Sequence, residues 1–193
     1  MGYERKTNLT QRNIRESLIA LLEHTKFDLI TVNQIVEQAE VTRSTFYRYY
    51  EDKYDLLSEI EEMIVSHIND ERIKLQQQFP GENIFNVEMY KQIFQSLEPY
   101  SLAIQRLLGR NGDSSFEMKL KNEIAKRFFA LEEMQHVSKV RGDLVREYVF
   151  VILIKTFQYW SNNKDHIDID EVAATLRDIQ LVGLKKAIGL YDV

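Results

Sequence analysis

Apolar residues recur along most of this chain at intervals of three and four positions, which is the spacing of one face of an α-helix. The first clear stretch runs from about Thr10 to His24, where one face is formed by Ile14, Leu18, Leu21 and Leu22. Strict alternation of apolar and polar residues, the pattern of a half-buried strand, is hard to find. The short run Asp28 to Val32 resembles a strand but is too isolated to pair with another. The pattern therefore predicts an all-α fold of about nine helices.

Start and stop signals delimit the next helices. Thr31 and Gln34 have the spacing of a capping box and predict the start of a short second helix. Thr42 is the N-cap candidate of a third helix that runs from Arg43 to about Tyr50. Asp52 caps a long fourth helix, and later helices are predicted at about 86–97, 100–108, 114–131, 143–161 and 171–188, with Ser114 and either Asp168 or Asp170 among the caps.

Glycine and proline are concentrated in the second part of the chain. Neither residue occurs between Tyr3 and Phe79, and both appear from Pro80 and Gly81 onwards. We therefore place a domain boundary inside the fourth helix. Residues 1–55 are predicted to form an N-terminal three-helix domain, and residues 56–193 a helical C-terminal domain.

The second and third predicted helices, joined by a short turn and preceded by a supporting helix, form a helix-turn-helix. At about 100° per residue, Phe46 and Tyr50 rotate towards the core. The opposite face of the third helix is short, polar and cationic, and it consists of Arg43, Ser44, Tyr47 and Arg48. Such a face suits the DNA major groove, where an arginine can donate two hydrogen bonds to one guanine.

Hydroxyl groups and one ammonium in the same region suit phosphate oxygens, which fix the register of a protein on DNA. They belong to Thr31, Thr42, Thr45, Tyr47, Tyr49 and Lys53. The same residues also have an ordinary explanation, because Thr31 and Thr42 serve as N-caps without DNA and aromatic residues at helical spacing are usually core. Periodicity alone leaves both interpretations open.

The stretch ITVNQIVEQAEVTRSTFYRYYEDKYDLL, residues 30–57, resembles the DNA-binding domain of the tetracycline-repressor (TetR) family of transcriptional regulators. The shared features are the threonine that opens the second helix, an apolar pair, an alanine before the turn and the Thr-Phe-Tyr sequence at 45–47. The resemblance implies that Arg43, Ser44 and Arg48 read bases. It also implies that phosphates are bound by Thr31, Thr42, Thr45, Tyr47, Tyr49 and Lys53.

Two positions depart from the family pattern. Glu40 stands where the family usually has a glycine in the turn, and a left-handed conformation there would cost roughly 1 kcal/mol relative to glycine. Tyr49 stands where many members have histidine, and its hydroxyl can still donate to a phosphate. Neither change removes the base-reading face.

The C-terminal helices of family members form dimers, and the sequence supports a dimer independently. The helix at 143–161 is apolar all round, so it must be covered on more than one side. The predicted interface consists of Tyr148, Ile152, Phe157, Trp160, Ala173, Leu176, Gly183 and Ala187. The alternative is that this helix is the centre of a monomeric core.

Family members often bind a small-molecule effector as well. The region from Tyr100 to Phe128 resembles the ligand domain of one branch of the family. The candidate pocket residues are Tyr90, Phe94, Gln95, Arg106, His136 and Tyr159. An ordinary core or surface role stays open for each of them.

Charge and composition narrow the function further. The chain has a formal net charge of −5, but residues 1–53 are neutral, with eight basic and eight acidic side chains. This region can bind DNA if its cations share one face. The absence of cysteine excludes disulfides and thiolate metal sites, and neither an HExxH pair nor a glycine-rich phosphate loop occurs. We therefore predict no enzyme activity, no cofactor and no metal site.

The longest apolar run is far shorter than the roughly 18 residues of a membrane span, and the chain starts without a signal-peptide pattern, so we expect a cytoplasmic protein. The sequence thus predicts a DNA-binding transcriptional regulator. It would bind double-stranded DNA at a near-palindromic operator as a homodimer, most commonly as a repressor, with possible release by a small molecule. The alternative is a helical interaction or ligand-binding protein that does not bind operator DNA on its own.

Overall fold

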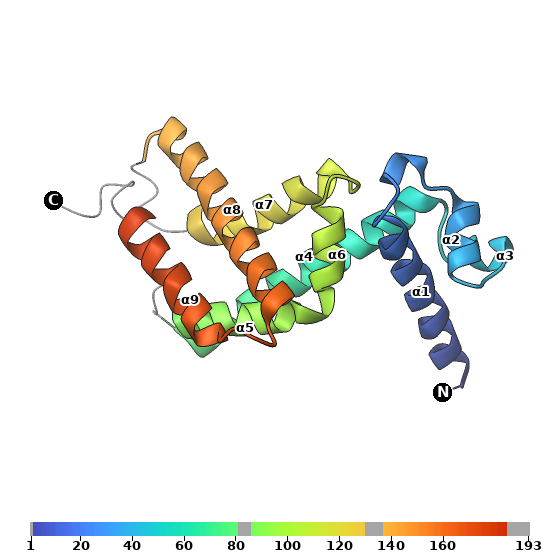
Figure 1. Cartoon of the computed structure of the whole chain (residues 1–193), viewed down its shortest axis with the longest axis horizontal. Helices are drawn as coiled ribbons and strands as arrows, with labels where there is room; N and C mark the ends of the chain where they lie inside the picture. Colours follow the sequence, from blue (N-terminus) through green and yellow to red (C-terminus); the bar gives the residue numbers. More distant parts are fainter. Residues whose placement is uncertain (1, 81–85, 130–136, 185–193) are drawn as a thin grey trace. The chain divides into compact units, whose positions relative to one another are not determined.

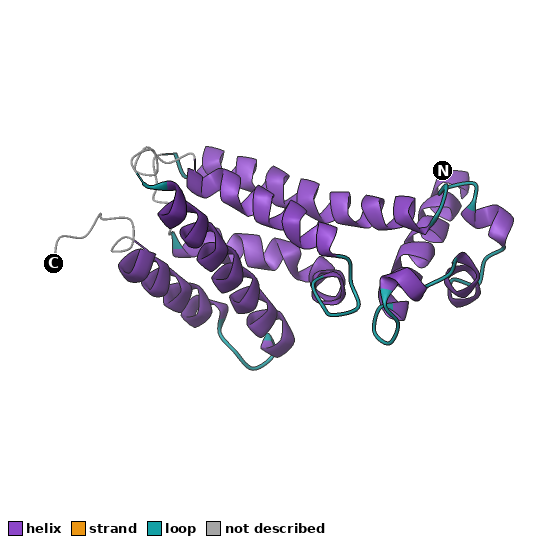
Figure 2. Ribbon diagram, turned by 90° about the horizontal axis from the view of Figure 1, so that it is seen from above, coloured by secondary structure: helices purple, strands orange, loops and turns teal. Residues whose placement is uncertain are grey.

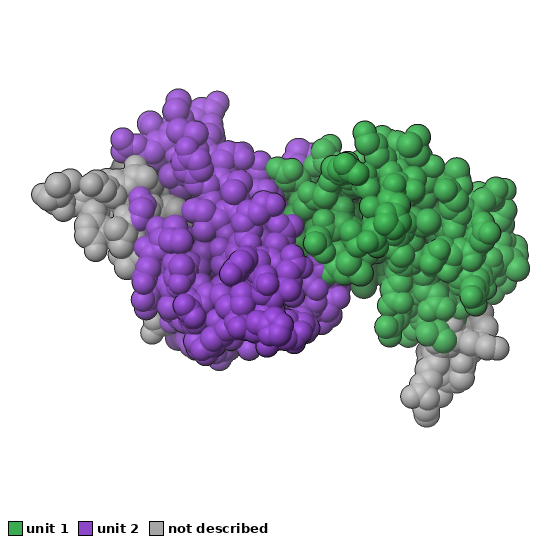
Figure 3. Space-filling model, viewed as in Figure 1, with its two compact units in different colours: residues 1–66, 102–117 green, residues 67–101, 118–193 purple. Residues whose placement is uncertain are grey.

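The computed structural model describes residues 2–80, 86–129 and 137–184, and over these ranges it consists of helices and loops without a strand (Figure 1, Figure 2). The all-α prediction is confirmed. The chain divides into two compact units, which we call the head unit, residues 1–66 and 102–117, and the body unit, residues 67–101 and 118–193 (Figure 3). The unit boundary at 66/67 and the predicted domain boundary at 55/56 both lie inside helix α4, Lys53–Gln78.

The head unit begins with helix α1, Gly2–Leu21, and the 3₁₀ helix η1, Phe27–Leu29. Helices α2, Val32–Gln38, and α3, Arg43–Phe46, follow, and α2 packs against both α1 and α3. Helix α1 starts well before the predicted Thr10, because the polar residues before it show no apolar face yet still favour a helix. Helix α3 ends before the predicted Tyr50.

Helices α1, α2, α3 and α4 each contribute side chains to the core of the head unit. Ile14 and Leu18 of α1, Ile35 of α2, Phe46 of α3 and Leu56 of α4 are each fully buried. This burial fixes α3 against the other helices, because four residues form too few internal hydrogen bonds to hold a helix alone.

The body unit contains helices α5, Val87–Leu97, α8, Lys139–Asn163, and α9, Ile169–Asp178. The 3₁₀ helix η2, Glu98–Tyr100, follows α5, and a π-helical segment, Ile179–Leu184, follows α9. Helix α9 packs against α5 and α8 (Figure 1). Aromatic contacts join α5 to α8, with ring centroids 5.5 Å apart for Phe94 and Phe157 and 6.0 Å apart for Phe94 and Trp160.

Helices α6 and α7 differ from the sequence prediction, which placed both in the C-terminal domain. Helix α6, Ser101–Leu107, lies almost entirely in the head unit. Helix α7, Ser114–Phe129, begins in the head unit and continues in the body unit. The predicted cap Ser114 is the first residue of α7, and Asp113 caps it instead, since its Oδ1 accepts a hydrogen bond from the Ser115 amide at 2.7 Å.

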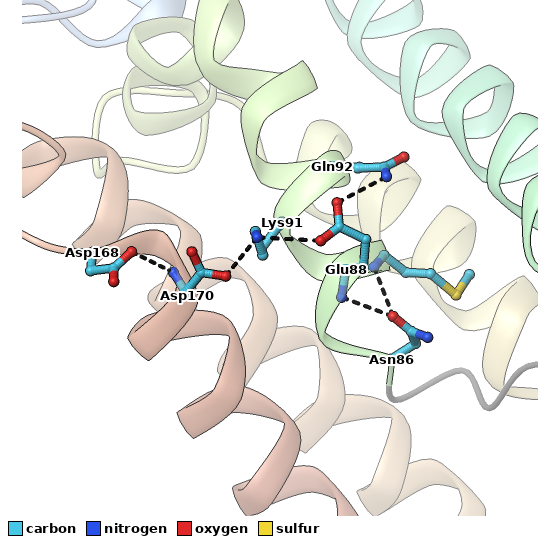
Figure 4. A network of polar contacts seen from close by, with 7 residues as sticks. Asn86, Glu88, Lys91, Gln92, Asp168 and Asp170 are labelled. Carbon is cyan, nitrogen blue, oxygen red and sulfur yellow. Dashed lines mark hydrogen bonds and ion pairs between the residues drawn. The ribbon is translucent and has the colours of Figure 1, made fainter.

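A polar network joins the starts of α5 and α9 in the body unit (Figure 4). The Asn86 side chain caps α5 by accepting from the amides of Glu88 and Met89, and Asp168 caps α9 by accepting from the amide of Asp170. The ammonium of Lys91 bridges the two helices through Asp170, at 2.5 Å, and Glu88, at 3.3 Å. These two carboxylates, Asp170 first, raise the pKa of Lys91 above its ordinary value. The predicted Asp168 cap is confirmed.

Glu40 makes the turn between α2 and α3. Its φ is 54°, which is a left-handed conformation. No other non-glycine residue in the described ranges has a positive φ. The Glu40 amide donates to the Glu37 carbonyl and the Val41 amide donates to the Val36 carbonyl, which together form the Schellman arrangement that usually ends in glycine. The left-handed conformation considered from the sequence is therefore present.

Replacement of Glu40 by glycine should stabilise the protein by about 1 kcal/mol, because glycine adopts positive φ without steric cost. In thermal unfolding followed by circular dichroism, we expect an increase of roughly 2–4 °C in Tm. The matched control is Glu37→Gly inside α2, which should lower stability by about 1 kcal/mol. A decrease in Tm for Glu40→Gly would contradict the strain at this turn.

Candidate nucleic-acid interface

Helix α3 presents two chemically different faces. Phe46 is fully buried and Tyr50 is 4% exposed, whereas Arg43, Ser44 and Arg48 are exposed. The rotation predicted from the sequence is confirmed. Helical hydrogen bonding also continues past the last residue of α3, because the amides of Tyr49 and Tyr50 both donate to the Phe46 carbonyl. Arg48 therefore lies on the helix-like turn that directly follows α3.

Local contacts orient the exposed side chains of α3. The Arg43 Nη2 donates to the Tyr47 hydroxyl at 3.2 Å, and the guanidinium lies 5.7 Å from the centroid of that ring. Thr42 caps the helix by accepting from the Thr45 amide at 3.1 Å, and its hydroxyl lies 2.9 Å from that of Ser44. Arg48 forms no ion pair within the described residues. The face is thus cationic, with donors that can reach a groove.

None of the hydroxyl residues predicted to bind phosphate is fully buried. Thr31, Thr42 and Tyr47 are exposed, and Thr45 and Tyr49 are half-buried. Thr31 forms the predicted capping box with Gln34, whose amide donates to the Thr31 hydroxyl at 3.3 Å. The Thr31 hydroxyl also donates its one O–H to the Gln34 Oε1 at 2.9 Å, so a phosphate contact would replace that bond.

Lys53 differs from the rest of the predicted phosphate group. Its ammonium points at backbone carbonyls of the head unit and donates to those of Phe27, Asp28 and Ile30 at 2.8–2.9 Å. The structure therefore gives this lysine a set of protein partners that the sequence pattern did not indicate.

A polar cluster beneath Tyr50 joins three parts of the head unit. Arg15 of α1 donates to Glu59 of α4 at 3.1 Å, and the buried Tyr50 hydroxyl interacts with both side chains. Burial raises the pKa of the Tyr50 phenol, and the Glu59 carboxylate raises it further. Sequence reasoning missed Arg15 and Glu59, because nothing local marks a pair separated by 44 positions.

The turn between α6 and α7 contacts the end of α1. The Asn111 side-chain amide donates to the carbonyls of Leu22, at 3.0 Å, and Glu23, at 3.3 Å. The Asn111 carbonyl accepts from the Phe27 amide at 2.8 Å. Gly112 permits this turn, since a Cβ there would lie 1.9 Å from the Leu107 carbonyl oxygen. Residues 107–116, which belong to the region compared above with a ligand domain, are thus part of the head unit.

The residues predicted for an effector pocket occupy different environments. Tyr90 and Phe94 are buried in the core of the body unit, whereas Gln95 and Tyr159 are exposed. Arg106 belongs to the head unit and pairs with Glu23 at 2.9 Å. His136 lies outside the described residues. Tyr90 donates a hydrogen bond to Gln180 of the π-helical segment, a partner that the sequence did not indicate.

The residues predicted for a dimer interface also divide into groups. Phe157, Trp160, Ala173 and Leu176 are buried within a single chain, so they offer little surface to a partner. Tyr148 is 59% exposed, Ile152 is half-buried and Gly183 is exposed. Ala187 lies outside the described residues. Burial of Phe157 and Trp160 reflects their contacts with Phe94 of α5.

Among the described residues, no helix is long and apolar enough to cross a membrane. The same part of the chain contains no group of three or more histidine, aspartate or glutamate side chains that could hold a metal ion.

Two family models match the chain. The model for bacterial regulatory proteins of the tetR family matches residues 14–60, and the model for a transcriptional regulator C-terminal region matches residues 87–180. The first match covers the end of α1, η1, α2, α3 and the start of α4, all within the head unit. Together the two models cover most of the chain.

Two curated proteins are similar over short segments. An uncharacterized HTH-type transcriptional regulator of Bacillus subtilis (strain 168), YxbF, is 36% identical over 50 residues, which are 26% of this chain and 13% of that protein. The HTH-type transcriptional regulator AcrR of Shigella flexneri is 32% identical over 73 residues, which are 38% of this chain and 34% of AcrR. The chain thus matches about a third or less of the length of either relative.

Solved structures share the fold over nearly the whole chain. A TetR transcriptional regulator from Streptococcus agalactiae has a TM-score of 0.58 at 23% identity and covers 93% of this chain and 97% of its own. The fatty acid degradation regulator FadR from Bacillus halodurans has a TM-score of 0.58 at 17% identity, covering 91% and 96%. NalD of Pseudomonas aeruginosa, a secondary repressor of a multidrug efflux pump, has a TM-score of 0.52 at 15% identity, covering 93% and 97%.

The buried Tyr50 phenol predicts a loss of stability in alkali. Its pKa is raised above the ordinary value of 10, so the folded state keeps a proton that the unfolded state releases. Stability should therefore decrease as the pH rises above about 10. In melting curves from pH 8 to 11, Tyr50→Phe should show a smaller decrease in Tm than the unmodified protein.

The control for this experiment is Tyr54→Phe, which changes a 55% exposed ring outside the proposed interfaces and should leave the alkaline decrease as it is. Equal alkaline losses in Tyr50→Phe and the unmodified protein would mean that the Tyr50 phenol does not titrate in this way.

Proposed function

Because the chain belongs to the tetR family of bacterial regulatory proteins, which are non-enzymatic DNA-binding transcription factors, we propose that it is a repressor that binds a near-palindromic operator as a homodimer. It is a transcriptional regulator with a helix-turn-helix domain, and the family consists of non-enzymatic proteins, as the sequence predicts. Binding to an operator, dimer formation and repression of transcription are the parts that we propose. Since DNA is its partner, we place its action in the cytoplasm.

The observation that carries the proposal is the exposed face of α3. Two arginines, Arg43 and Arg48, flank the small side chain of Ser44, and all three are exposed. A small residue allows the helix to approach the base edges closely, while each arginine can donate to O6 and N7 of a guanine. We assign base reading to these three residues and phosphate contacts to Thr31, Thr42, Thr45, Tyr47 and Tyr49.

The homodimer is supported by a second apolar face on α8. Val145, Val149, Phe150, Phe157 and Trp160 are buried within the chain. On the other side of the helix, within an arc of roughly 100°, lie exposed apolar side chains, which are Val140, Leu144, Tyr148, Val151 and Tyr159. Such a stripe is typical of a helix that packs against a partner. We therefore base the dimer on this exposed stripe and Ile152, and assign Phe157 and Trp160 to the protomer core.

Repression is the common mode of the family and enters the proposal on that ground. Release by a small-molecule effector is supported by Gln180, which is fully buried and whose Nε2 has no hydrogen-bond partner among the described residues. A buried unpaired amide is costly, and a polar group of a bound molecule would satisfy it. Tyr90, which donates to the Gln180 oxygen, would line the same site.

The alternative is a helical interaction protein that does not bind operator DNA on its own. Selection of genomic DNA fragments by the purified full-length protein, with retesting at about 50 and 200 mM salt, distinguishes the two. Enrichment of a near-palindromic motif that is bound more weakly at higher salt supports the regulator. Absence of enrichment at both salt concentrations would favour the alternative.

Arg43→Ala should weaken binding to the selected operator about 5- to 150-fold and relax sequence preference at one position in each half-site. The reason is the loss of two hydrogen bonds to a single base. The measurement is a titration of operator variants with substitutions at each position. The matched control is Arg141→Ala, an exposed arginine at the start of α8, which should leave affinity and preference unchanged. Unaltered preference in Arg43→Ala would refute the base-reading assignment.

Tyr148→Asp should convert the dimer into monomers, because it places a charge in the middle of the exposed apolar stripe of α8. Light scattering after size-exclusion chromatography measures the mass directly. Met118→Asp is the control, since Met118 is 62% exposed on a different helix, and this variant should stay dimeric. A monomeric unmodified protein, or a dimeric Tyr148→Asp, would contradict this interface.

A further inference from the structure

Lys53 is the first residue of α4, and its ammonium is surrounded by the backbone of a distant segment. It donates to the carbonyls of Phe27, at 2.9 Å, Asp28, at 2.8 Å, and Ile30, at 2.8 Å. The ammonium also lies 4.9 Å from the ring centroid of Phe27 and 5.3 Å from that of Tyr54. All of these groups belong to the head unit.

The hydrogen-bonding capacity of Lys53 is fully used by these contacts. A lysine ammonium has three N–H donors, and each has a carbonyl partner at a good distance. A phosphate contact would require at least one of these bonds to break and a half-buried ammonium to turn outwards. The exposed arginines of α3 need no such rearrangement.

The bonds of Lys53 connect the two ends of the helix-turn-helix. Ile30 directly precedes Thr31, the N-cap of α2. Lys53 is the first residue of α4 and lies 23 positions after Ile30. Helix α2, the Glu40 turn and helix α3 all lie within this interval. The Lys53–Ile30 bond therefore closes the segment into a loop, which limits the positions that α3 can take relative to α4.

We propose that Lys53 is a positioning residue for DNA binding, which clamps the carbonyls of the Phe27–Ile30 segment and so fixes the reading helix, and that it is not a phosphate ligand. The proposal rests on the DNA binding proposed above. Without the ammonium, three carbonyls lose a charged donor together, and the closed segment from Ile30 to Lys53 opens at its base. The sequence alone favoured the phosphate role, because a local pattern does not reveal partners 23–26 positions away.

The two roles predict different effects of substitution. A phosphate ligand contributes about one unit to the salt dependence of binding, and arginine replaces lysine well in that role. A clamp contributes no salt-dependent contact with DNA. Arginine should also fail as a clamp, because its planar fork cannot direct donors to three converging carbonyls as a tetrahedral ammonium does.

The test uses the full-length protein with Lys53→Met and Lys53→Arg, together with Lys26→Met as the matched control. Lys26 is an exposed lysine directly before Phe27, so its removal changes the charge of the same region without removing the clamp. Hydrogen–deuterium exchange is measured without DNA, and operator affinity is measured over a range of salt concentrations.

We expect both Lys53 variants to exchange faster at the amides of residues 29–38, while Lys26→Met exchanges as the unmodified protein does. We expect operator binding to weaken about tenfold in both Lys53 variants with the salt slope unchanged. A reduction of the slope by about one in Lys53→Met, together with normal binding by Lys53→Arg, would overturn the proposal.

The exchange measurement separates this proposal from the proposed function. Unaltered exchange in both Lys53 variants overturns the clamp, whether or not the protein binds DNA. Faster exchange in a protein that binds no operator would support the clamp while refuting the regulator. If Lys53→Met fails to fold, Lys53→Arg provides the same two measurements.

Discussion

The reading face of this protein depends on the anchoring of a helix that is too short to persist alone. Helix α3 has four residues, whereas isolated helices shorter than about 12–15 residues are marginal in water. The buried ring of Phe46 ties it to the core of the head unit, and the side chain of Thr42 accepts a hydrogen bond from the Thr45 amide. Every contact that α3 could make with a base requires this anchor, because a frayed helix would not hold its arginines on one side.

Much of the head unit follows from local sequence. The capping box at Thr31, the burial of Phe46 and Tyr50, and the exposed side of α3 were all predictable from residues a few positions apart. The missing glycine marked Glu40 as the turn residue, but its left-handed conformation is known only from the structure. Each of these features has its cause within one or two helical turns, which is the range that a sequence pattern reports.

The features that escaped prediction have partners far along the chain. Lys53 contacts carbonyls more than twenty positions away, and Asn111 contacts the carbonyl of Leu22, just after α1, at a separation of 89 positions. In the body unit, periodicity identified α8 as apolar all round but could not distinguish the side that faces its own chain. Phe157 and Trp160, expected at an interface between chains, pack against Phe94 instead. The hydrophobic pattern indicates that a helix face is buried. Only the tertiary structure shows which residues bury it.

The turn around Asn111 bears on how such regulators could be recombined. Residues 1–66 transplanted onto the remainder of another family member would leave behind Asn111, and with it the donor to Leu22 and Glu23 and the acceptor for the Phe27 amide. The portable part of this protein is therefore discontinuous. A working chimera would carry residues 102–117 together with the N-terminal segment, and its crossover points would lie at the ends of both.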